Sequence, residues 1–430
     1  MRSRRTSAAV ATLAALAIVL SACGGAGSSG NSSGGKGKLE VFSWWTSGSE
    51  ATALNVLFTE FKKKSPDVGV INAAVSGGGG SNAQQALATR LQGGNPPDSW
   101  QLHPDQDLFA AVGDGTVADV SALYTKNGWV GKLPSQIDAM LKKNGKYYAV
   151  PVNAHRANTL WTNPAVLQKA GVSWSNSTTL DQWVSDLQKI KASGTTPLCL
   201  GDKDIFASAQ LLESVIISHT GAQGWRDLFT NKLSFADAKV RSALKVYGQL
   251  LGLANPDHTA ETWDQAVVQM TEGKCAATLM GDWAYGEMIN KGKAEGKDFT
   301  YIPFPGTSGT YVFVGDAFVI PAKDGPNPTA EKAWLSVMLE PQVQKDFNKA
   351  KGSAPVRTDV PLDDFPAYQK AAAQSLRQDQ VVSSLAHRQV APAEFAQIYA
   401  DAVTTFNGAK DVDSFINTMT NAQKTKLGGP

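Results

Sequence analysis

Apolar and polar residues along the body of the chain follow a repeated strand–helix order. Strand-like apolar runs cover residues 39–43, 68–75 and 99–102. Between the first two runs, apolar residues recur at the helical spacing i, i+3, i+4 and i+7, at Leu54, Leu57, Phe58 and Phe61. We expect this helix to have Ser49 as its N-cap and to end before Pro66, and a second helix to cover residues 82–91. The βαβαβ order predicts a parallel sheet with helices on its faces.

This sheet would place aromatic and polar residues at one edge. Ligands of parallel sheets bind just beyond the carboxyl ends of the strands. Trp44 and Trp45 follow the first strand, and Gln101 and His103 lie at the end of the third. We therefore expect these two segments to face one crevice, although they are far apart in the sequence.

The rest of the pattern is mainly helical and contains a few extended segments. Residues 147–152 predict a strand, which is followed by Asn153 and His155. Helices are expected near residues 179–193, 205–219, 235–252 and 262–273, and the C-terminal part of the chain is mostly helical as well. Extended runs are expected at 300–305 and 311–321. The fold class is therefore α/β.

Length and composition agree with a folded protein that has more than one core. A chain of 430 residues is long for a single core and suits two lobes. Hydrophobic residues make up 42% and charged residues 18%, so the chain can bury cores and is not broadly disordered. Eleven tryptophans are a high number, and their wide rings suit the binding of flat, partly apolar ligands.

The N-terminal segment has the features of a bacterial export signal. Three arginines precede an apolar run from Ala8 to Leu20, which is short for a membrane span and typical of a signal peptide over residues 1–22. The sequence that ends at Cys23 resembles a lipobox, in which cleavage precedes the cysteine and its thiol is acylated. Residues 23–38 are rich in Gly and Ser and predict a flexible, lipid-anchored linker. The Arg4-Arg5 pair leaves the general secretory and twin-arginine routes both open.

Removal of the signal peptide changes the net charge of the chain. Lys+Arg falls from 40 to 37 with the loss of Arg2, Arg4 and Arg5, against 38 Asp+Glu, which gives a mature charge near −1. No basic stretch remains that would support nucleic-acid binding. Cys199 and Cys275 are the other two cysteines. In an oxidising compartment they could form a disulfide, and the alternative is two small buried residues.

Six motifs along the body carry a resemblance to a known family. They are Phe42-Ser43-Trp44-Trp45, the segment from Gly93 to His103, Val150 to Asn158, Met280-Gly281-Asp282-Trp283-Ala284, Lys351-Gly352-Ser353, and Leu385-Ala386-His387 before Val390-Ala391-Pro392. In this order they resemble the extracellular solute-binding proteins of carbohydrate ABC importers, and within them the glucose/galactose/mannose-binding proteins. The resemblance covers about residues 38–430.

The resemblance implies a two-lobe, periplasmic-binding-protein-like fold in which the lobes close on a sugar. From the interrupted sheet pattern we infer three interlobe crossings, near Asn153, Pro303 and Ser336. The first α/β lobe would then comprise residues 39–152 and 304–336. The second, mainly helical lobe would comprise residues 153–303 and 337–430.

The resemblance also implies which side chains bind the sugar. The candidate residues are Trp44, Trp45, Glu50, Gln101, His103, Trp263, Trp283, Asp316, Lys351 and His387, and we add Asn153 and His155 from the Val150–Asn158 motif. A pyranose has an apolar face, which a tryptophan covers, and a rim of hydroxyls, which need paired donors and acceptors. Asp316 would accept hydrogen bonds, while Lys351 and His387 would donate them.

Some of these residues have a structural alternative. A tryptophan in such a strand is more often core than ligand platform, and one of Trp44 and Trp45 could pack in the core while the other stacks on the sugar. His103 and His155 could be structural histidines, and Asp282 could cap a helix. A carboxylate in the apolar run around Asp316 needs buried partners, and a binding site would supply them.

The sequence therefore indicates a binding protein rather than an enzyme. No Gly-x-Ser-x-Gly nucleophile elbow is recognised: the one match, Gly30 to Gly34, lies in the Gly/Ser-rich linker and not between a strand and a helix. No metal site or cofactor is expected. Expected partners are a small sugar, the membrane subunits of an ABC importer and, through the lipid anchor, the extracytoplasmic face of the membrane. The protein is expected to be a monomer.

A monosaccharide such as glucose is the first choice of ligand. The alternatives are a disaccharide or short oligosaccharide, a secreted sugar-active hydrolase whose carboxylates meet only in space, or a scaffold without a ligand.

Overall fold

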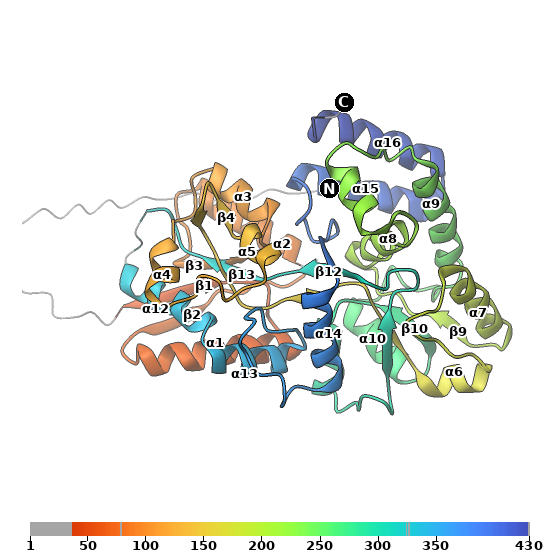
Figure 1. Cartoon of the computed structure of the whole chain (residues 1–430), viewed down its shortest axis with the longest axis horizontal. Coiled ribbons are helices and arrows are strands. Elements are labelled where there is room, and N and C mark those ends of the chain that lie inside the picture. Colours follow the sequence, from red (N-terminus) through yellow and green to blue (C-terminus); the bar gives the residue numbers. More distant parts are fainter. Residues whose placement is uncertain (1–36, 78–79, 324, 326, 429–430) are drawn as a thin grey trace, which may run out of the picture. The chain divides into compact units, whose positions relative to one another are not determined.

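The computed structural model describes residues 37–428 except for 78–79, 324 and 326 (Figure 1). The predicted signal peptide, Cys23 and nearly all of the predicted linker lie outside the described residues. The described residues all belong to one compact unit. No helix in the described ranges is both long enough and apolar enough to span a bilayer.

The described residues contain short strands and a larger number of helical residues. The strands are β1 (Lys38–Phe42), β2 (Gly69–Asn72), β3 (Ser99–Leu102), β4 (Lys142–Lys143), β5 (Lys146–Tyr147), β6 (Val150–Pro151), β7 (His155–Arg156), β8 (Thr159–Thr162), β9 (Thr196–Leu198), β10 (Cys275–Leu279), β11 (Thr300–Pro303), β12 (Thr310–Val314), β13 (Ala317–Val319) and β14 (Gln380–Ser383). The helices are α1 (Gly48–Lys64), α2 (Ser81–Gln92), α3 (Gln106–Gly113), α4 (Ser121–Lys126), α5 (Ser135–Met140), α6 (Pro164–Ala170), α7 (Leu180–Ala192), α8 (Phe206–Phe229), α9 (Ala238–Leu251), α10 (Trp263–Thr271), α11 (Trp283–Asn290), α12 (Pro328–Met338), α13 (Pro341–Lys351), α14 (Ala367–Gln378), α15 (Ala393–Ala409) and α16 (Val412–Lys426).

The N-terminal βαβαβ prediction is confirmed by a five-stranded sheet in the order β2-β1-β3-β13-β6. Strand β1 pairs in parallel with both β2 and β3, while β13 is antiparallel to β3 and β6. Leu54, Leu57 and Phe61 of α1 are buried, as their helical spacing requires. The N-cap prediction is wrong by two residues: Ser47 occupies that position, and Ser49 is buried in the first turn.

A second sheet, in the order β11-β8-β10-β9, carries the mainly helical half (Figure 1). Helices α7 to α10 form where the periodicity predicts them, although α8 continues beyond the expected end to Phe229, across Gly221 at φ 71. The buried residues form two large clusters. We call the one around Leu54, Trp100 and Phe318 the first core, and the one around Trp161, Leu212 and Leu279 the second core.

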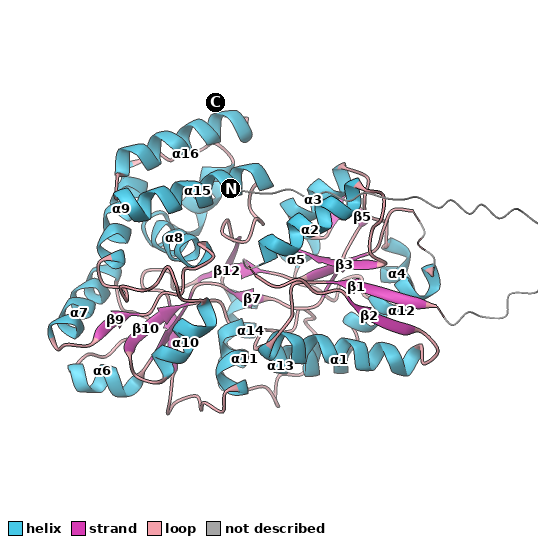
Figure 2. Cartoon of the chain, turned by 180° about the vertical axis from the view of Figure 1, so that it is seen from behind, coloured by secondary structure: helices cyan, strands magenta, loops and turns pink. Residues whose placement is uncertain are grey.

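A third, three-stranded sheet, β14-β12-β7, lies between the other two (Figure 2). The extended run predicted over residues 311–321 is two strands rather than one. Strand β12 belongs to this middle sheet, whereas β13 belongs to the five-stranded sheet. Gly315 and Asp316 lie at the break, so the carboxylate of Asp316 is held where the chain passes from one sheet to the next.

Two of the three predicted crossings follow the sheet order. The chain leaves the five-stranded sheet after β6, near Asn153, and returns from the second sheet after β11, near Pro303. The third is not at Ser336. Helix α13 packs against α1, and its Val343 and Phe347 belong to the first core. Because only two residues separate α12 from α13, the chain has no room to leave that core there.

The later passage occurs through α14 and β14. In α14, Ala372 belongs to the second core and Leu376 to the first, and the same division applies to Val382 and Val381 in β14. Residues 337–351 therefore pack with the first lobe, which corrects the boundary that we drew from the sequence. Helices α15 and α16 do pack in the second core, as expected.

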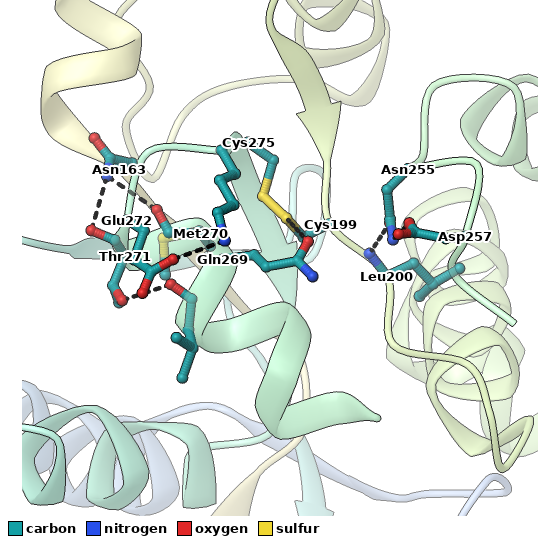
Figure 3. The surroundings of a disulfide bond; sticks show 12 residues. Asn163, Cys199, Leu200, Asn255, Asp257, Gln269, Met270, Thr271, Glu272 and Cys275 are labelled. Atoms are coloured by element: carbon teal, nitrogen blue, oxygen red, sulfur yellow. Dashed lines mark hydrogen bonds and ion pairs between the residues drawn. A yellow bond between two sulfur atoms is a disulfide. The ribbon is translucent and has the colours of Figure 1, made fainter. Parts of the chain in front are cut away.

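Cys199 and Cys275 form a disulfide, with their Cα atoms 5.7 Å apart (Figure 3). Cys275 is the first residue of β10, and Cys199 directly follows β9, its parallel neighbour. Both cysteines are buried. Of the two alternatives left open by the sequence, the structure contains the bonded pair.

Candidate ligand-binding site

A cavity of about 330 Å³ collects residues from both cores. Ten of the twelve candidate residues line it, namely Trp44, Trp45, Glu50, His103, His155, Trp263, Trp283, Asp316, Lys351 and His387. Trp44 and His103 lie in loops just after the carboxyl ends of β1 and β3, and Trp283 begins α11, shortly after the carboxyl end of β10. The strand-end rule for parallel sheets thus explains why residues so distant in sequence meet here.

Asp316 is the most tightly held polar residue of the cavity wall. Its side chain is buried, and its two oxygens accept hydrogen bonds of 2.7 Å each from Gln101 Nε2 and Asn153 Nδ2. Asn153 Oδ1 also accepts a hydrogen bond from the Asp316 backbone N–H. Gln101 and Asn153 do not line the cavity. The structure places them behind Asp316, where their side-chain amides hold its carboxylate.

A buried histidine lies between two carboxylates beside this residue. His155 Nδ1 bonds to Asp282 Oδ1, and its Nε2 lies 3.5 Å from Asp316 Oδ2. Burial disfavours the charged imidazole, yet the Asp282 carboxylate raises the pKa of His155 above its ordinary value. Burial also disfavours the charged form of Asp316, which by itself would raise the pKa of this carboxyl. Its hydrogen bond to His155 and the charges of His155 and Lys351 outweigh burial and hold that pKa well below its usual range.

Asp282 therefore has a different role from the helix cap considered above. It occupies the N-cap position of α11 but its side chain makes no capping hydrogen bond. Its Oδ2 instead accepts hydrogen bonds from the Arg156 backbone N–H at 3.1 Å and from the Tyr368 hydroxyl at 3.2 Å. The fully buried carboxylate thus fixes His155 and the start of the middle sheet.

An ion pair closes another part of the wall. Lys351 Nζ lies 2.8 Å from Glu50 Oε1 and 5.4 Å from the centre of the Trp45 ring. Glu50 comes from α1 and Lys351 from the end of α13, so the packing of α1 on α13 brings the two side chains together. The lysine is buried, and its charge is balanced by the carboxylate and the aromatic face.

The two adjacent tryptophans have different environments. Trp45 is 0% exposed and packs against Phe318 and Phe347 of the first core. Trp44 is half-buried, and its ring centre lies 5.0 Å from that of His103. Of the two alternatives, the structure therefore has Trp45 in the core and Trp44 at the cavity, although Trp45 also borders the cavity.

Gly80 allows Trp44 to lie where it does. Its φ of 100° is a left-handed value, and an added Cβ would be 3.0 Å from the Trp44 ring. Glycine is the residue that satisfies both conditions without strain. Gly80, directly before α2, thus supports the aromatic wall.

The other half of the wall is formed by aromatic rings of the second core. Trp283 stacks edgewise near His155 and His387, with ring centres 5.2 and 5.3 Å apart, and Trp263 is half-buried at the start of α10. Burial, and then the charge of nearby His103, lowers the pKa of His387 to about 3. His387 is therefore a neutral imidazole at neutral pH.

Sequence reasoning missed several residues of the cavity wall. They include Asp204, Phe206, Thr262, Asp264, Glu287 and Lys291. Asp204 and Phe206 follow β9, which we did not predict because its apolar residues gave no strand length or alternation. Had β9 been recognised, the same strand-end rule would have indicated these two. Asp264 and Glu287 follow Trp263 and Trp283 in their helices and carried no separate signal.

The charged groups of the wall are mostly acidic. Five carboxylates, of Glu50, Asp204, Asp264, Glu287 and Asp316, stand against the two lysines Lys291 and Lys351. Lys351 pairs with Glu50, and Lys291 Nζ lies 3.6 Å from Glu287 Oε1. An excess of acceptors suits a neutral ligand rich in hydroxyl donors better than an anion. In the described ranges, no three His, Cys, Asp or Glu side chains are placed to hold a metal ion.

The fold and the cavity together have the form of a binding protein, and comparisons with known proteins agree. The family model of the bacterial extracellular solute-binding proteins matches residues 45–345. An uncharacterized ABC transporter extracellular-binding protein of Pyrococcus horikoshii is 33% identical over 392 residues, which are 91% of this chain and 88% of the relative. A probable sugar-binding periplasmic protein of Mesorhizobium japonicum is 33% identical over 378 residues, which are 86% of this chain and 88% of the relative.

Solved structures share the two-lobe architecture. A chitin oligosaccharide binding protein superimposes with a TM-score of 0.80 at 17% identity, covering 91% of this chain and 99% of that one. The chain belongs to the bacterial extracellular solute-binding proteins. The family prediction from the six motifs is confirmed, and so are the two-lobe α/β fold and the prediction of a binding protein rather than an enzyme.

The half-buried Trp44 provides a direct test of the aromatic wall. We expect Trp44→Ala to fold normally and to lose about tenfold or more in ligand affinity, because it removes a face that packs on the apolar side of a ligand. Isothermal titration calorimetry measures the affinity. Trp174→Ala is the matched control: Trp174 is also half-buried, but it packs away from the cavity and bonds to Asp186. Equal affinity in the two variants would contradict a role for Trp44.

Proposed function

We propose that this protein is the sugar-binding component of an ABC importer and that it captures a monosaccharide of the glucose type. One observation carries the proposal: the cavity combines the rings of Trp44 and Trp283 with the buried, ionised carboxylate of Asp316. Aromatic faces suit the apolar side of a pyranose, and an anchored carboxylate suits neighbouring hydroxyls. The names of the relatives, an ABC transporter extracellular-binding protein and a probable sugar-binding protein, support the same class of ligand.

The volume of the cavity favours a small sugar. Ligand pockets in proteins commonly measure about 300–1,000 Å³, and this one, at about 330 Å³, is near the lower end. The second candidate is a disaccharide or short oligosaccharide, favoured by the likeness of the fold to a chitin oligosaccharide binding protein. That likeness concerns the fold, whereas the volume concerns this chain's own site, so we prefer the monosaccharide.

A ligand panel tests the proposal. A ligand that binds only the folded protein stabilises it by about 2.7 kcal/mol at 100 times its Kd. Glucose, galactose, mannose, xylose, maltose and a chitin disaccharide should be compared by thermal shift and calorimetry. We expect one or more monosaccharides to raise the melting temperature and the disaccharides to raise it less. Stabilisation by the disaccharides alone would favour the second candidate, and no response to any sugar would contradict the proposal.

We further propose that Cys23 carries the lipid that holds the mature, monomeric protein at the extracytoplasmic face of the membrane, and that its two lobes close on the sugar. Cys23→Ala should leave the sugar affinity unchanged and move the protein from the membrane fraction to the medium. Sugar binding should reduce the radius of gyration in small-angle scattering, because a ligand that touches both lobes favours the closed form. An unchanged radius at saturation would contradict closure.

A further inference from the structure

A buried carboxylate behind the cavity holds the turn that carries His387. Glu213 lies on α8, is 0% exposed and does not line the cavity. Its Oε1 accepts a hydrogen bond of 2.8 Å from Ser384 Oγ, and its Oε2 accepts backbone N–H bonds from Leu385 at 2.8 Å and Ala386 at 3.1 Å. These bonds fix the residues between β14 and His387 against α8.

The hydrogen bonds of Ser384 determine where the His387 proton lies. Its hydroxyl has one hydrogen, which goes to Glu213, and two lone pairs. His387 Nδ1 lies 3.0 Å and the His387 backbone N 3.3 Å from Ser384 Oγ. Since the single hydrogen is used on Glu213, both of these nitrogens must donate to the serine oxygen. The proton of the neutral imidazole is then on Nδ1.

The other ring nitrogen is left free for a ligand. His387 lines the cavity, and no residue in the described part of the chain bonds to its Nε2. Its ring is held edgewise by Trp283, His103 and Phe206. With the proton on Nδ1, Nε2 is an acceptor. This reverses the expectation from the sequence that His387 donates to the sugar.

We propose that Glu213, acting through Ser384, sets the tautomer of His387 so that Nε2 accepts a hydrogen bond from a sugar hydroxyl. Glu213 is thus a positioning residue that determines specificity without touching the ligand. The inference rests on the proposed sugar-binding function. The order carboxylate–hydroxyl–imidazole differs from that of a hydrolase triad, in which the imidazole lies between the other two groups.

The arrangement also makes the tautomer sensitive to the protonation of Glu213. Burial raises the pKa of Glu213 to about 7, although its three hydrogen-bond donors oppose the rise. When Glu213 takes a proton from solvent, its O–H donates to Ser384 Oγ. The serine hydrogen then turns to His387 Nδ1. The ring releases its Nδ1 proton to solvent and takes one up from solvent at Nε2, so that it stays neutral. His387 becomes a donor as the pH falls below about 7.

Other ionisable groups surround this chain of hydrogen bonds and must be considered in any pH titration. His103, His155 and Asp316 face His387 across the cavity. Tyr399 of α15 is close enough to Glu213 for the carboxylate charge to raise its pKa further above the value that burial produces. A variant at constant pH therefore tests Glu213 more directly than a titration does.

Nitrogen NMR of the sugar-free protein, with 15N-labelled histidine at pH 8, reads the tautomer. We expect the His387 signals, identified by their loss in His387→Gln, to show a bare Nε2 and a protonated Nδ1. In Glu213→Gln, the amide oxygen can still accept from the backbone while its NH₂ donates to Ser384. The tautomer should therefore reverse. Ser384→Ala should also lose the parent pattern, whereas Ser214→Ala, next to Glu213 and buried, should keep it.

Two results would overturn the proposal: a protonated Nε2 in the parent protein at pH 8, or an unchanged tautomer in a folded Glu213→Gln protein. If Glu213→Gln does not fold, the unmodified protein can be measured at pH 6 instead. There we expect the reversed tautomer, with the proton on Nε2. A proton still on Nδ1 at pH 6 would contradict the mechanism.

A binding experiment separates this inference from the proposed function. A glucose series in which one hydroxyl at a time is replaced by fluorine, which cannot donate, should contain one member that binds the parent about tenfold more weakly. In Glu213→Gln that penalty should shrink at the same position. Failure of glucose and the other sugars of the panel to bind the parent would refute the proposed function, whereas the NMR result would still decide the tautomer.

Discussion

Replacing Asp316 with alanine is expected to abolish measurable sugar binding and to lower the free energy of unfolding by about 3–5 kcal/mol. The reason is that a buried ionic network loses its central charge. Gln101 Nε2 and Asn153 Nδ2 each lose a 2.7 Å acceptor, and His155 loses one of its two carboxylate neighbours and retains Asp282. Chemical denaturation measures the stability, and calorimetry with the best ligand of the panel measures the affinity.

Asp316→Asn separates the two effects. Asparagine keeps the shape, so the protein should fold, but its NH₂ group cannot accept from one of the two amides. A hydrogen bond to a charged group contributes about 1.5–3 kcal/mol, so we expect an affinity loss of about 10- to 100-fold. Asp186→Asn is the control, because Asp186 is also buried but bonds to Trp174, Gln182 and Lys189 away from the cavity. Equal affinities in the two asparagine variants would contradict the assignment.

The low pKa of Asp316 adds a pH signature. Because the folded-state pKa lies below the unfolded value of about 3.9, the stability from this carboxylate is full above that pH. It is lost as the pH falls through the folded-state pKa. Asp316→Asn should therefore lose less stability than the parent between neutral and strongly acidic pH. The same decline in both proteins would show that Asp316 does not contribute.

Loss of the Cys199–Cys275 disulfide is expected to destabilise the protein by about 4.5 kcal/mol on the loop-entropy model. The bond closes a loop with a sequence separation of 76 residues and ties β9 to β10 in the second sheet. Reduction under denaturing conditions, or the double variant Cys199→Ala/Cys275→Ala, should shift the urea midpoint accordingly. A change below about 1 kcal/mol in both experiments would contradict this estimate.

Ligand affinity should respond much less than stability to this change. The bond lies at the start of β10, whereas the cavity residue Trp283 follows the other end of that strand. The double variant should therefore bind within about threefold of the parent at a temperature where both are folded. A larger loss would mean that the bond also holds the loop from Cys199 to Phe206 in its binding position.

Much of the fold could be predicted from the pattern of residues. Strand β3 and helices α7 and α10 form within a few residues of their expected bounds, because apolar periodicity reports which side of an element is buried. The same pattern does not report which core an element joins. Helix α13 has an ordinary amphipathic sequence, and only its packing on α1 assigns it to the first core.

The candidate site divides in the same way. The types of side chain and their positions at strand ends could be predicted from the sequence, and ten of the twelve predicted residues line one cavity. The individual role of each residue could not be predicted. Trp44 and Trp45 are adjacent and alike in sequence, and both border the cavity, yet Trp44 is half-buried there while Trp45 is fully buried in the first core.

By itself, the sequence determined the family, the βαβαβ start and the segments that meet at the cavity, because these follow from local spacing and ordered motifs. Only the tertiary structure decided the partners of the polar groups. Gln101 and Asp316 are 215 residues apart, and Glu213 and Ser384 are 171 apart, yet each pair is hydrogen-bonded in the interior. A buried polar group takes whichever partner the fold brings to it, and no local pattern names that partner.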